Sequence, residues 1–423
     1  MNVHSRILAM PRSVISRTHL AQYLLTLHEK YALFRDHTKT QELAEIWQKT
    51  FLEKDLSLHT KQRQILCNSL RIDHYIHENV VLGKNIVPQL FPLIESSIII
   101  TDRTVYPLFQ KYYNTALREA IVYTIDTITG DALREIIDNV MKSHAQFVVG
   151  IGGGRVMDIL KFIQMKIIQM ENGKFFLAFP TSLATHVYAS PKIHVLPAIA
   201  ELGYQSTIDG PVPDLVVLDT LFLERLQQTN PRLIRAGLGD IMAYITAVED
   251  WKLAEMNGKD AINNVVVEMC SDTIKRLHKI NVQLPLSQWI QEYSFIQVLL
   301  CNITDWVGSP PASGSEHLFA KEAEEGIHPP PLHGELVALG TLIMTKVQGG
   351  DCQRVHNLMK TFQLPTSLSE IGLTVEQAVS AMQRCRSYGR KKERFTIAEI
   401  VDFNKEYSQQ IIEGLIENGL IHE

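Results

Sequence analysis

The sequence predicts an α/β domain built on a parallel sheet, followed by an all-helical domain. Its 423 residues, of which 45% are hydrophobic and 21% charged, are enough for two substantial cores. Short apolar runs alternate with segments of helical length over residues 75–219, which is typical of βαβ units. From residue 220 to residue 423 helical periodicity dominates, which indicates the second, all-helical domain.

Charge and cysteine content narrow the classes of function. The net charge of −5 does not favour binding to nucleic acid or to an anionic membrane surface. The five cysteines are widely spaced and form no CxxC pair, as in a reduced intracellular protein. The sequence also shows no apolar stretch of signal-peptide or membrane-spanning type. We therefore expect a cytoplasmic homo-oligomer that acts on a small molecule, without nucleic-acid or membrane partners.

The elements are expected in the following order. Residues 1–74 carry leucine and aromatic residues at helical spacing, so we expect a helical N-terminal extension that contributes no catalytic residues. In the α/β region the expected strands are SIIIT, AIVYTI, QFVVGIGGG, FFLAFP and LVVLD. In the helical region the expected helices include TLFLERLQQTN, DIMAYITAVEDWKLAEM and VEQAVSAMQRC, separated by the proline-rich loops GSPPASGS and GIHPPPLHG.

A glycine turn joins the QFVVGI strand to a helical pattern in GIGGGRVMDILKF, where it contains Gly152, Gly153 and Gly154. Glycine lets backbone amides approach a ligand closely, and the helix start behind the turn offers unpaired N–H groups and a positive dipole end. The turn is therefore a candidate pyrophosphate site. A tight turn that only packs is the alternative, because the spacing is not the GxGxxG fingerprint.

Asp102 is a second candidate for nucleotide binding, because it ends the SIIIT strand. A carboxylate at such a position can accept hydrogen bonds from an adenosine ribose and disfavour a 2′-phosphate. The neighbouring Arg103 would instead accommodate a 2′-phosphate, and Asp102 could simply cap a turn or helix. The residues therefore leave open whether a bound nucleotide carries a 2′-phosphate.

Three residues of the helical region form a candidate metal site. His317 in SGSEHLF and His333 in PPLHGELVALG each follow a loop near the start of an expected helix, and Asp240 in RAGLGDIMAYI is expected to begin another helix after two glycines. Neutral imidazoles and a carboxylate suit zinc or ferrous iron, and three protein ligands leave a position for a substrate oxygen. Taken singly, Asp240 could be an N-cap and the two histidines could be packing residues.

The motifs occur in an order that resembles the superfamily of iron- or zinc-dependent alcohol dehydrogenases, glycerol dehydrogenase and dehydroquinate synthase. From residue 75 onward they are GIGGGRVMD, PTSLATHVYASP, PDLVVLD, RAGLGDIMAYITAVEDWKLA, SGSEH, HGELVALG and KKERFTI. The resemblance is nearest to the glycerol-1-phosphate dehydrogenase branch. It implies a nucleotide-binding domain over 75–219, a metal-binding domain over 220–423 and an active site between them. It also implies NAD or NADP and a divalent metal, with zinc favoured over iron.

The same resemblance assigns roles to individual positions. The residues that would contact the cofactor are Gly152, Gly153, Gly154, Asp158, Thr181, Ser182 and Ser190. The residues that match the metal ligands are Asp240, His317 and His333. The implied reaction is hydride transfer between a nicotinamide and a polyol, sugar phosphate or related hydroxy compound, with the metal stabilising an alkoxide. Protons would leave through water or substrate hydroxyls, and a histidine such as His186 could assist their transfer.

Three positions depart from the pattern of the related glycerol enzymes. His186 replaces an acidic residue, Tyr244 stands where a lysine is expected, and Pro310 replaces an arginine. Each lost cation removes about 1.5–3 kcal/mol of charge-assisted contact with a phosphate. The identity of the substrate therefore stays open.

Other side chains could take over substrate binding. Lys192 or His194 could restore positive charge, or could be solvated at the surface. His186, Tyr188 and Tyr244 are the remaining candidates for substrate contacts, and the first two could bond a sugar or cyclitol hydroxyl.

Two other functions remain as alternatives. A carbocycle-forming synthase similar to dehydroquinate synthase would typically carry a glutamate in place of Asp240 and more basic residues for phosphate. A catalytically silent scaffold would use the N-terminal helices for binding, but the intact Asp/His/His set argues against it.

Overall fold

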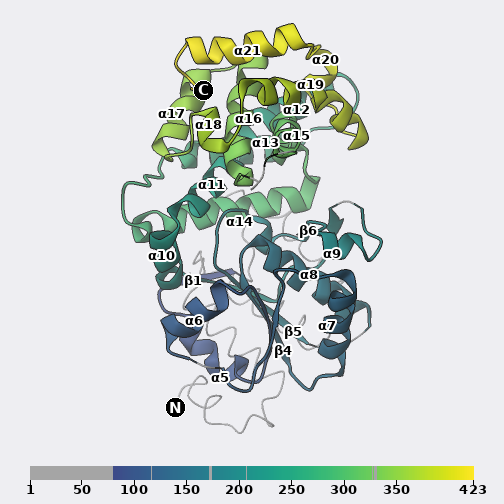
Figure 1. Ribbon diagram of the computed structural model, residues 1–423, viewed down its shortest axis with the longest axis vertical. Coiled ribbons are helices and arrows are strands. Elements are labelled where there is room, and N and C mark those ends of the chain that lie inside the picture. Colours follow the sequence, from purple (N-terminus) through teal and green to yellow (C-terminus); the bar gives the residue numbers. More distant parts are fainter. Residues whose placement is uncertain (1–79, 116, 171–173, 206, 326, 328–330) are drawn as a thin grey trace. The chain divides into compact units, whose positions relative to one another are not determined.

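The computed structural model describes residues 80–115, 117–170, 174–205, 207–325, 327 and 331–423. The helical extension expected for residues 1–74 lies outside these residues. The chain forms two compact units, which are described separately here (Figure 1). Among the described residues, one unit contains those up to Ser182 together with Val187–Leu226, and the other contains Leu183–His186 and Gln227–Glu423.

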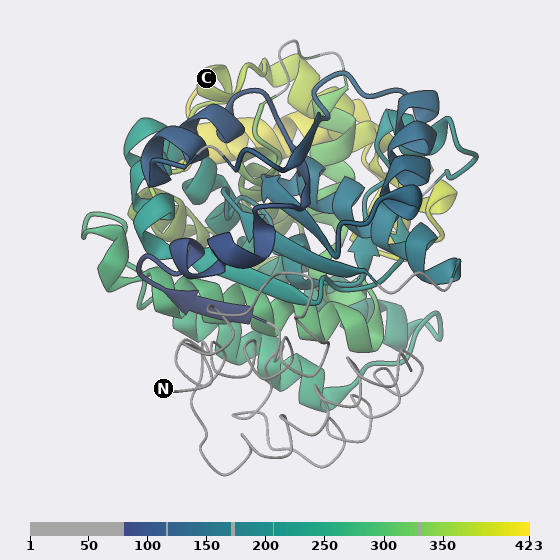
Figure 2. The same ribbon diagram turned by 90° about the horizontal axis from the view of Figure 1, so that it is seen from below.

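A six-stranded parallel sheet forms the centre of the first unit (Figure 2). Its spatial order is β1-β8-β5-β4-β2-β3. All residues of β2, β4, β5 and β8 are buried, as expected for strands covered by helices on both faces. The strands are β1 (Val80–Gly83), β2 (Ile98–Thr101), β3 (Ile121–Thr124), β4 (Phe147–Gly152), β5 (Phe175–Pro180) and β8 (Leu215–Asp219). The five apolar runs expected as strands are confirmed, and the short β1 was missed.

The order of the strands reverses between β2 and β4. From β2 the chain passes through α6 (Val105–Tyr113) to β3 at the edge, and α7 (Gly130–Lys142) then returns it to β4 on the other side of β2. Because both crossovers are right-handed, α6 and α7 cover opposite faces of the sheet (Figure 1). Ligands of open α/β sheets bind at the carboxyl ends of the strands where the order reverses. Asp102 follows β2 at this edge, and the glycine turn follows β4.

An aromatic contact packs α6 against the sheet. Phe109 of α6 is fully buried, with its ring 6.3 Å from that of Phe179 and 5.8 Å from that of Phe222. This aromatic contact fixes α6 against the sheet. The other helices are η3 (Val87–Leu90), α5 (Phe91–Ile94), α8 (Gly154–Gln169), η4 (Val187–Ala189), α9 (Pro197–Ala200) and α10 (Thr220–Thr229), and the strands β6 (Lys192–Ile193) and β7 (Ile208–Asp209) form an antiparallel pair.

The second unit consists of helices. Its elements are α11 (Pro231–Met242), α12 (Tyr244–Met256), α13 (Asn264–Leu277), η5 (Leu286–Gln288), α14 (Ile290–Val307), η6 (Pro310–Ala312), α15 (Ser315–Glu324), α16 (His333–Val347), α17 (Cys352–Thr361), α18 (Leu368–Ile371), α19 (Val375–Lys391), α20 (Ile397–Ile400) and α21 (Lys405–Glu417). The α/β fold with a helical second part is thus confirmed. Within the described residues, no helix combines the length and apolar composition that a membrane span requires.

Glycines set the distance between α11 and α16. A Cβ atom at Gly239 would lie 2.2 Å from the carbonyl oxygen of Gly334, closer than real Cβ contacts. Gly239 therefore allows the two helices to pack backbone against backbone, and a Cβ atom at Gly237 would lie 2.1 Å from the carbonyl oxygen of Leu183. Asp240 was expected to begin a helix, but it lies in the last turn of α11, which continues through both glycines. That expectation was wrong because these glycines serve close packing and do not break the helix.

Candidate functional site

Asp240, His317 and His333 come together in the second unit. Asp240 lies near the end of α11, His317 is the third residue of α15 and His333 is the first residue of α16. One ligand atom from each residue lies within 4.8 Å of the others. Oδ1 of Asp240 is 3.4 Å from Nε2 of His317 and 3.8 Å from Nε2 of His333. Three helices that are separate in sequence thus direct three donor atoms to one point.

The geometry of this cluster fits a divalent metal ion. Two ligands that each lie about 2.05 Å from a tetrahedral ion are about 3.3 Å apart. The two distances from Asp240 are therefore close to those of a bound ion, and only small side-chain rotations are needed. Two imidazole nitrogens and one carboxylate oxygen suit zinc or ferrous iron, and they leave a coordination position for a substrate oxygen.

Charge is balanced within the cluster. Burial opposes ionisation of Asp240, but the neighbouring imidazoles of His186, His317 and His333 hold the pKa of its carboxyl well below its usual range. Burial also opposes protonation of His317, yet hydrogen bonds to Asp240 and Glu316 raise the pKa of this imidazole to about 9. Asp240 is therefore ionised at neutral pH, which is the form that binds a cation.

His186 also lies beside the metal candidates. Its Nδ1 is 3.6 Å from Oδ2 of Asp240, which is slightly too long for a hydrogen bond, and the side chain is 12% exposed. Two side chains of α14 bond to residues 183–186. The Cys301 thiol donates to the His186 carbonyl at 2.6 Å, and the Tyr293 hydroxyl donates to the Leu183 carbonyl at 2.5 Å. The position expected from the sequence thus brings a third imidazole to Asp240.

The two tyrosines expected to contact substrate are both buried. Tyr244 is 0% exposed, and among the described residues its hydroxyl has no hydrogen-bond partner. Burial raises the pKa of this hydroxyl well above its usual value. Tyr188, in the first unit, is 1% exposed. Neither side chain presents a surface to solvent, so their positions do not favour the expected contact with substrate.

Pro310 lies in the loop before α15, beside a cavity of about 630 Å³. Arg394, from the KKERFTI motif, lines the same cavity. Its guanidinium donates to the carbonyl of Ser313 at 3.1 Å and to the hydroxyl of Ser309. An arginine therefore contacts this loop from a distant part of the sequence, although sequence analysis assigned it no role.

In the first unit, the glycine turn forms an open cradle. Gly152 ends β4, and Gly153 precedes α8, whose N-terminus has no side-chain cap. Among the described residues, a Cβ atom at Gly153 would meet only the Cβ of Ser182, at 3.7 Å. The Thr181 amide donates to the Gly152 carbonyl at 3.0 Å, so the segment after β5 lies beside the turn. The structure thus brings Thr181 and Ser182 to the glycines and leaves the helix start available for a phosphate.

Asp158 and Ser190 are placed differently from the glycines. Both side chains are buried, and Asp158 accepts a hydrogen bond from the His194 amide at 3.1 Å. Its carboxylate is also 3.7 Å from Nζ of Lys161, which in turn donates to the Ser190 carbonyl at 3.3 Å. In this arrangement the Asp158 carboxylate and the Lys161 ammonium bond to the backbone of residues 190–194.

Other charged candidates have local partners. Asp102 accepts hydrogen bonds from the amides of Thr104 at 2.9 Å and Val105 at 2.7 Å, which is the capping arrangement considered as its alternative. The side chain of Lys192 pairs with Asp209, and His194 is exposed. These contacts therefore do not identify a positively charged side chain that would bind a substrate phosphate.

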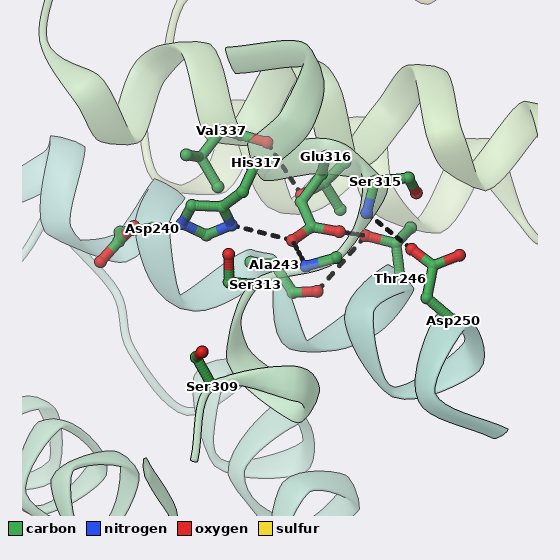
Figure 3. Close-up of polar contacts among 12 residues, drawn as sticks. Asp240, Ala243, Thr246, Asp250, Ser309, Ser313, Ser315, Glu316, His317 and Val337 are labelled. Carbon is green, nitrogen blue, oxygen red and sulfur yellow. Dashed lines mark hydrogen bonds and ion pairs between the residues drawn. The ribbon is translucent and has the colours of Figure 1, made fainter. Parts of the chain in front are cut away.

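One residue beside the cluster was overlooked in the sequence. Glu316 precedes His317, and its Oε1 lies 2.8 Å from Nδ1 of that histidine (Figure 3). The signal was present in SGSEH, where a carboxylate at a helix start directly precedes a candidate ligand.

Comparison with known proteins identifies the family. The sequence model of the iron-containing alcohol dehydrogenase family matches residues 83–225. The glycerol-1-phosphate dehydrogenase (NAD(P)+) of Archaeoglobus fulgidus is 28% identical over 354 residues, which cover 79% of this chain and 96% of that protein. The corresponding enzyme of Saccharolobus islandicus is 30% identical over 287 residues, which cover 65% of this chain and 76% of that protein. This chain belongs to the iron-containing alcohol dehydrogenase superfamily. Within it, the chain belongs to the glycerol-1-phosphate dehydrogenase branch, as the motifs indicated.

A solved structure supports the fold. The probable glycerol dehydrogenase of Sinorhizobium meliloti matches with a TM-score of 0.57 at 17% identity. The match covers 79% of this chain and 95% of that protein. The shared fold is the parallel sheet followed by helices.

Proposed function

We propose that this protein is a metal-dependent, NAD(P)-linked dehydrogenase of a polyol phosphate, with glycerol-1-phosphate and dihydroxyacetone phosphate as its substrate pair. The observation that carries this proposal is the convergence of Asp240, His317 and His333 in a chain of the glycerol-1-phosphate dehydrogenase branch. Because the relatives named above are dehydrogenases, we prefer this function to a carbocycle-forming synthase or a silent scaffold.

We assign the three residues to one divalent metal ion. When bound, the ion would act as a Lewis acid that stabilises the alkoxide of a secondary hydroxyl, or polarises the ketone in the reverse direction. Asp240 offsets part of the positive charge, and the two histidines supply neutral nitrogen donors. These donors suit either zinc or ferrous iron, and of the two we propose zinc as the bound ion.

His186 is the candidate for proton transfer. It is not one of the three ligands, but its Nδ1 lies 3.6 Å from Asp240 and is buried without a hydrogen-bond partner among the described residues. An imidazole in this position can take the proton that the substrate hydroxyl loses on oxidation. The substitution of an acidic residue by His186 thus preserves a group capable of proton transfer.

The glycine turn is the candidate site for the cofactor pyrophosphate. Gly153 has open space where other residues carry a side chain, and the backbone amides at the start of α8 point to this space without a capping side chain. Thr181 and Ser182 lie beside this turn, and their hydroxyls are candidates for further donors. We assign binding of the nicotinamide cofactor to these groups.

The deciding experiment is a turnover assay. Zinc-loaded protein and a chelator-treated control are assayed for oxidation of NADH and NADPH with dihydroxyacetone phosphate, and the configuration of the product is determined by chiral chromatography. Metal-dependent formation of glycerol-1-phosphate supports the proposal. Absence of turnover from protein that demonstrably holds metal would contradict the substrate assignment and direct the search to sugars, cyclitols and larger ketoses.

We further propose that the enzyme acts in the cytoplasm as a homo-oligomer. Light scattering during gel filtration tests the second statement directly, because it gives the mass of the assembly in solution for comparison with the 48.0 kDa chain.

A further inference from the structure

Glu316 is a completely buried carboxylate next to a proposed metal ligand. The residue is 0% exposed and is the second residue of α15. Its Oε1 lies 2.8 Å from Nδ1 of His317 and also accepts a hydrogen bond from the Gly314 amide at 2.6 Å. Its Oε2 accepts a hydrogen bond from the hydroxyl of Thr246 at 2.8 Å (Figure 3). Both oxygens are therefore fixed, and one of them is directed at the histidine.

Packing alone does not explain a charged residue at this position. Burial of a carboxylate costs free energy unless hydrogen bonds replace its hydration. Asp250, a second buried carboxylate, accepts a hydrogen bond from the Ser315 amide at 2.6 Å at the same helix start. Burial and the charge of Glu316 together raise the pKa of Asp250 to about 7. A neutral side chain at position 316 would fill the space without this repulsion.

The contact with Glu316 selects one tautomer of His317. A carboxylate only accepts hydrogen bonds, so Nδ1 of His317 must carry the proton. In the neutral imidazole, which is the form that binds a metal, Nε2 then holds the lone pair, and this atom lies 3.4 Å from Oδ1 of Asp240. For His333, by contrast, Nδ1 is buried and has no hydrogen-bond partner among the described residues. Of the two histidines, His317 is thus the one that a carboxylate orients.

We propose that Glu316 is a positioning residue of the metal centre, which holds His317 in the Nδ1–H tautomer with its Nε2 directed at the ion. A carboxylate that accepts from the outer nitrogen of a histidine ligand fixes the ring and increases the basicity of the inner nitrogen. Glu316 itself does not contact the ion in this role. The inference rests on the proposed function, because it assumes that His317 binds metal.

The test compares Glu316→Gln with a matched control, Glu322→Gln. Glu322 is also buried in α15, but its carboxylate pairs with Arg384 and not with a histidine. The full-length variants are stripped of metal, and their zinc affinity is measured by competition with a chromogenic chelator. We expect Glu316→Gln to lower the zinc affinity by about 10- to 100-fold, and Glu322→Gln to leave it at the wild-type level.

A spectroscopic measurement separates positioning from general stabilisation. In cobalt-substituted wild-type protein, the Nδ1 proton of His317 should give a paramagnetically shifted NMR resonance that exchanges slowly with water, because it is buried against Glu316. At saturating cobalt, Glu316→Gln should shift this resonance and speed its exchange, whereas Glu322→Gln should not. A merely structural role would leave the resonance unchanged.

The outcomes distinguish the two proposals. Wild-type protein that binds no zinc would contradict the proposed function itself. Wild-type protein that binds zinc, with equal affinity and an unchanged resonance in Glu316→Gln, would overturn only the role of Glu316. If Glu316→Gln does not fold, Glu316→Asp is tested in its place. The shorter side chain places the carboxylate farther from His317, so zinc binding should still be weaker than in the wild type. Unchanged zinc affinity in Glu316→Asp would also overturn the inference.

Discussion

Gly239 of α11 and Gly334 of α16 meet backbone against backbone. A Cβ atom at Gly334 would lie 1.7 Å from the carbonyl oxygen of Ala236, and one at Gly239 would lie 2.2 Å from the carbonyl oxygen of Gly334. Asp240 directly follows the first glycine, and His333 directly precedes the second. The close helix contact therefore brings two of the three candidate ligands together.

The first prediction concerns this contact. Gly334→Ala should push α11 and α16 apart, lower the free energy of unfolding by about 1–3 kcal/mol and weaken zinc binding by moving His333 away from Asp240. Urea denaturation of the metal-free protein and a zinc titration measure the two effects. Gly414→Ala in α21 is the control, because no atom lies within 4 Å of its added Cβ, and it should be neutral or slightly stabilising. Unchanged zinc affinity in Gly334→Ala would show that the glycine contact does not position the ligands.

Much of the fold could be predicted from the sequence, because its strongest signals are local. Runs such as Ile98–Thr101 and Phe147–Gly152 are apolar at every or nearly every position, and only a strand buried on both faces requires this. β1 escaped notice because its four residues, Val80–Gly83, are too few to form a clear pattern.

The candidate site was predictable in its residue types but not in its supporting contacts. His317 and His333 were found from their motifs, and the structure brings them to Asp240. The glycines before Asp240 were misread as a helix break, because the groups that pack on them, including Gly334 and the carbonyl of Leu183, lie far away in the sequence. The burial of Tyr244 and the contact between Glu316 and His317 likewise depend on tertiary packing, which cannot be predicted from the hydrophobic periodicity of the sequence.

The second prediction separates the metal site from the cofactor site. His317→Ala should abolish turnover and strongly reduce the zinc content, because it removes one of the three donors. NADH binding should be largely retained, because the proposed cofactor groups belong to β4, α8 and the segment after β5. Metal analysis by mass spectrometry and a fluorescence titration with NADH measure the two properties. Full activity of the variant in a metal-free state would disprove the proposed centre.

The third prediction concerns the glycine turn. Gly153→Val should weaken NADH binding without unfolding the protein, because the backbone of Gly153 has a φ of −81° and its only close neighbour is Ser182. Gly152→Ala provides the contrast, since its Cβ would lie 2.3 Å from Cγ2 of Val156 and should destabilise the first unit. Thermal unfolding and an NADH titration distinguish the two effects. If Gly153→Val binds NADH as tightly as the wild type, the turn has only a structural role.

The fourth prediction concerns the pH dependence of stability and starts from Asp250. Its carboxylate is 2% exposed, and burial together with the charge of Glu316 raises its pKa to about 7, from about 3.9 in an unfolded chain. Between these two values the folded protein binds more protons than the unfolded chain. The contribution of Asp250 to stability is therefore complete below pH 4 and is lost as the pH rises towards 7, at up to about 1.4 kcal/mol per pH unit.

Asp250→Asn should flatten this decline, because an amide does not titrate. The variant should also be less stable at pH 5, since the Asp250 oxygens accept from the amides of Ser315 and Ile397, and an Asn side chain must turn its NH₂ group towards one of these donors. Urea denaturation between pH 4 and 8 in the presence of chelator measures the slope without a contribution from metal. Asp131→Asn is the control, because its side chain is 91% exposed and the slope should stay as in the wild type. An undiminished slope in Asp250→Asn would assign the pH dependence to other groups and leave Asp250 ionised throughout this range.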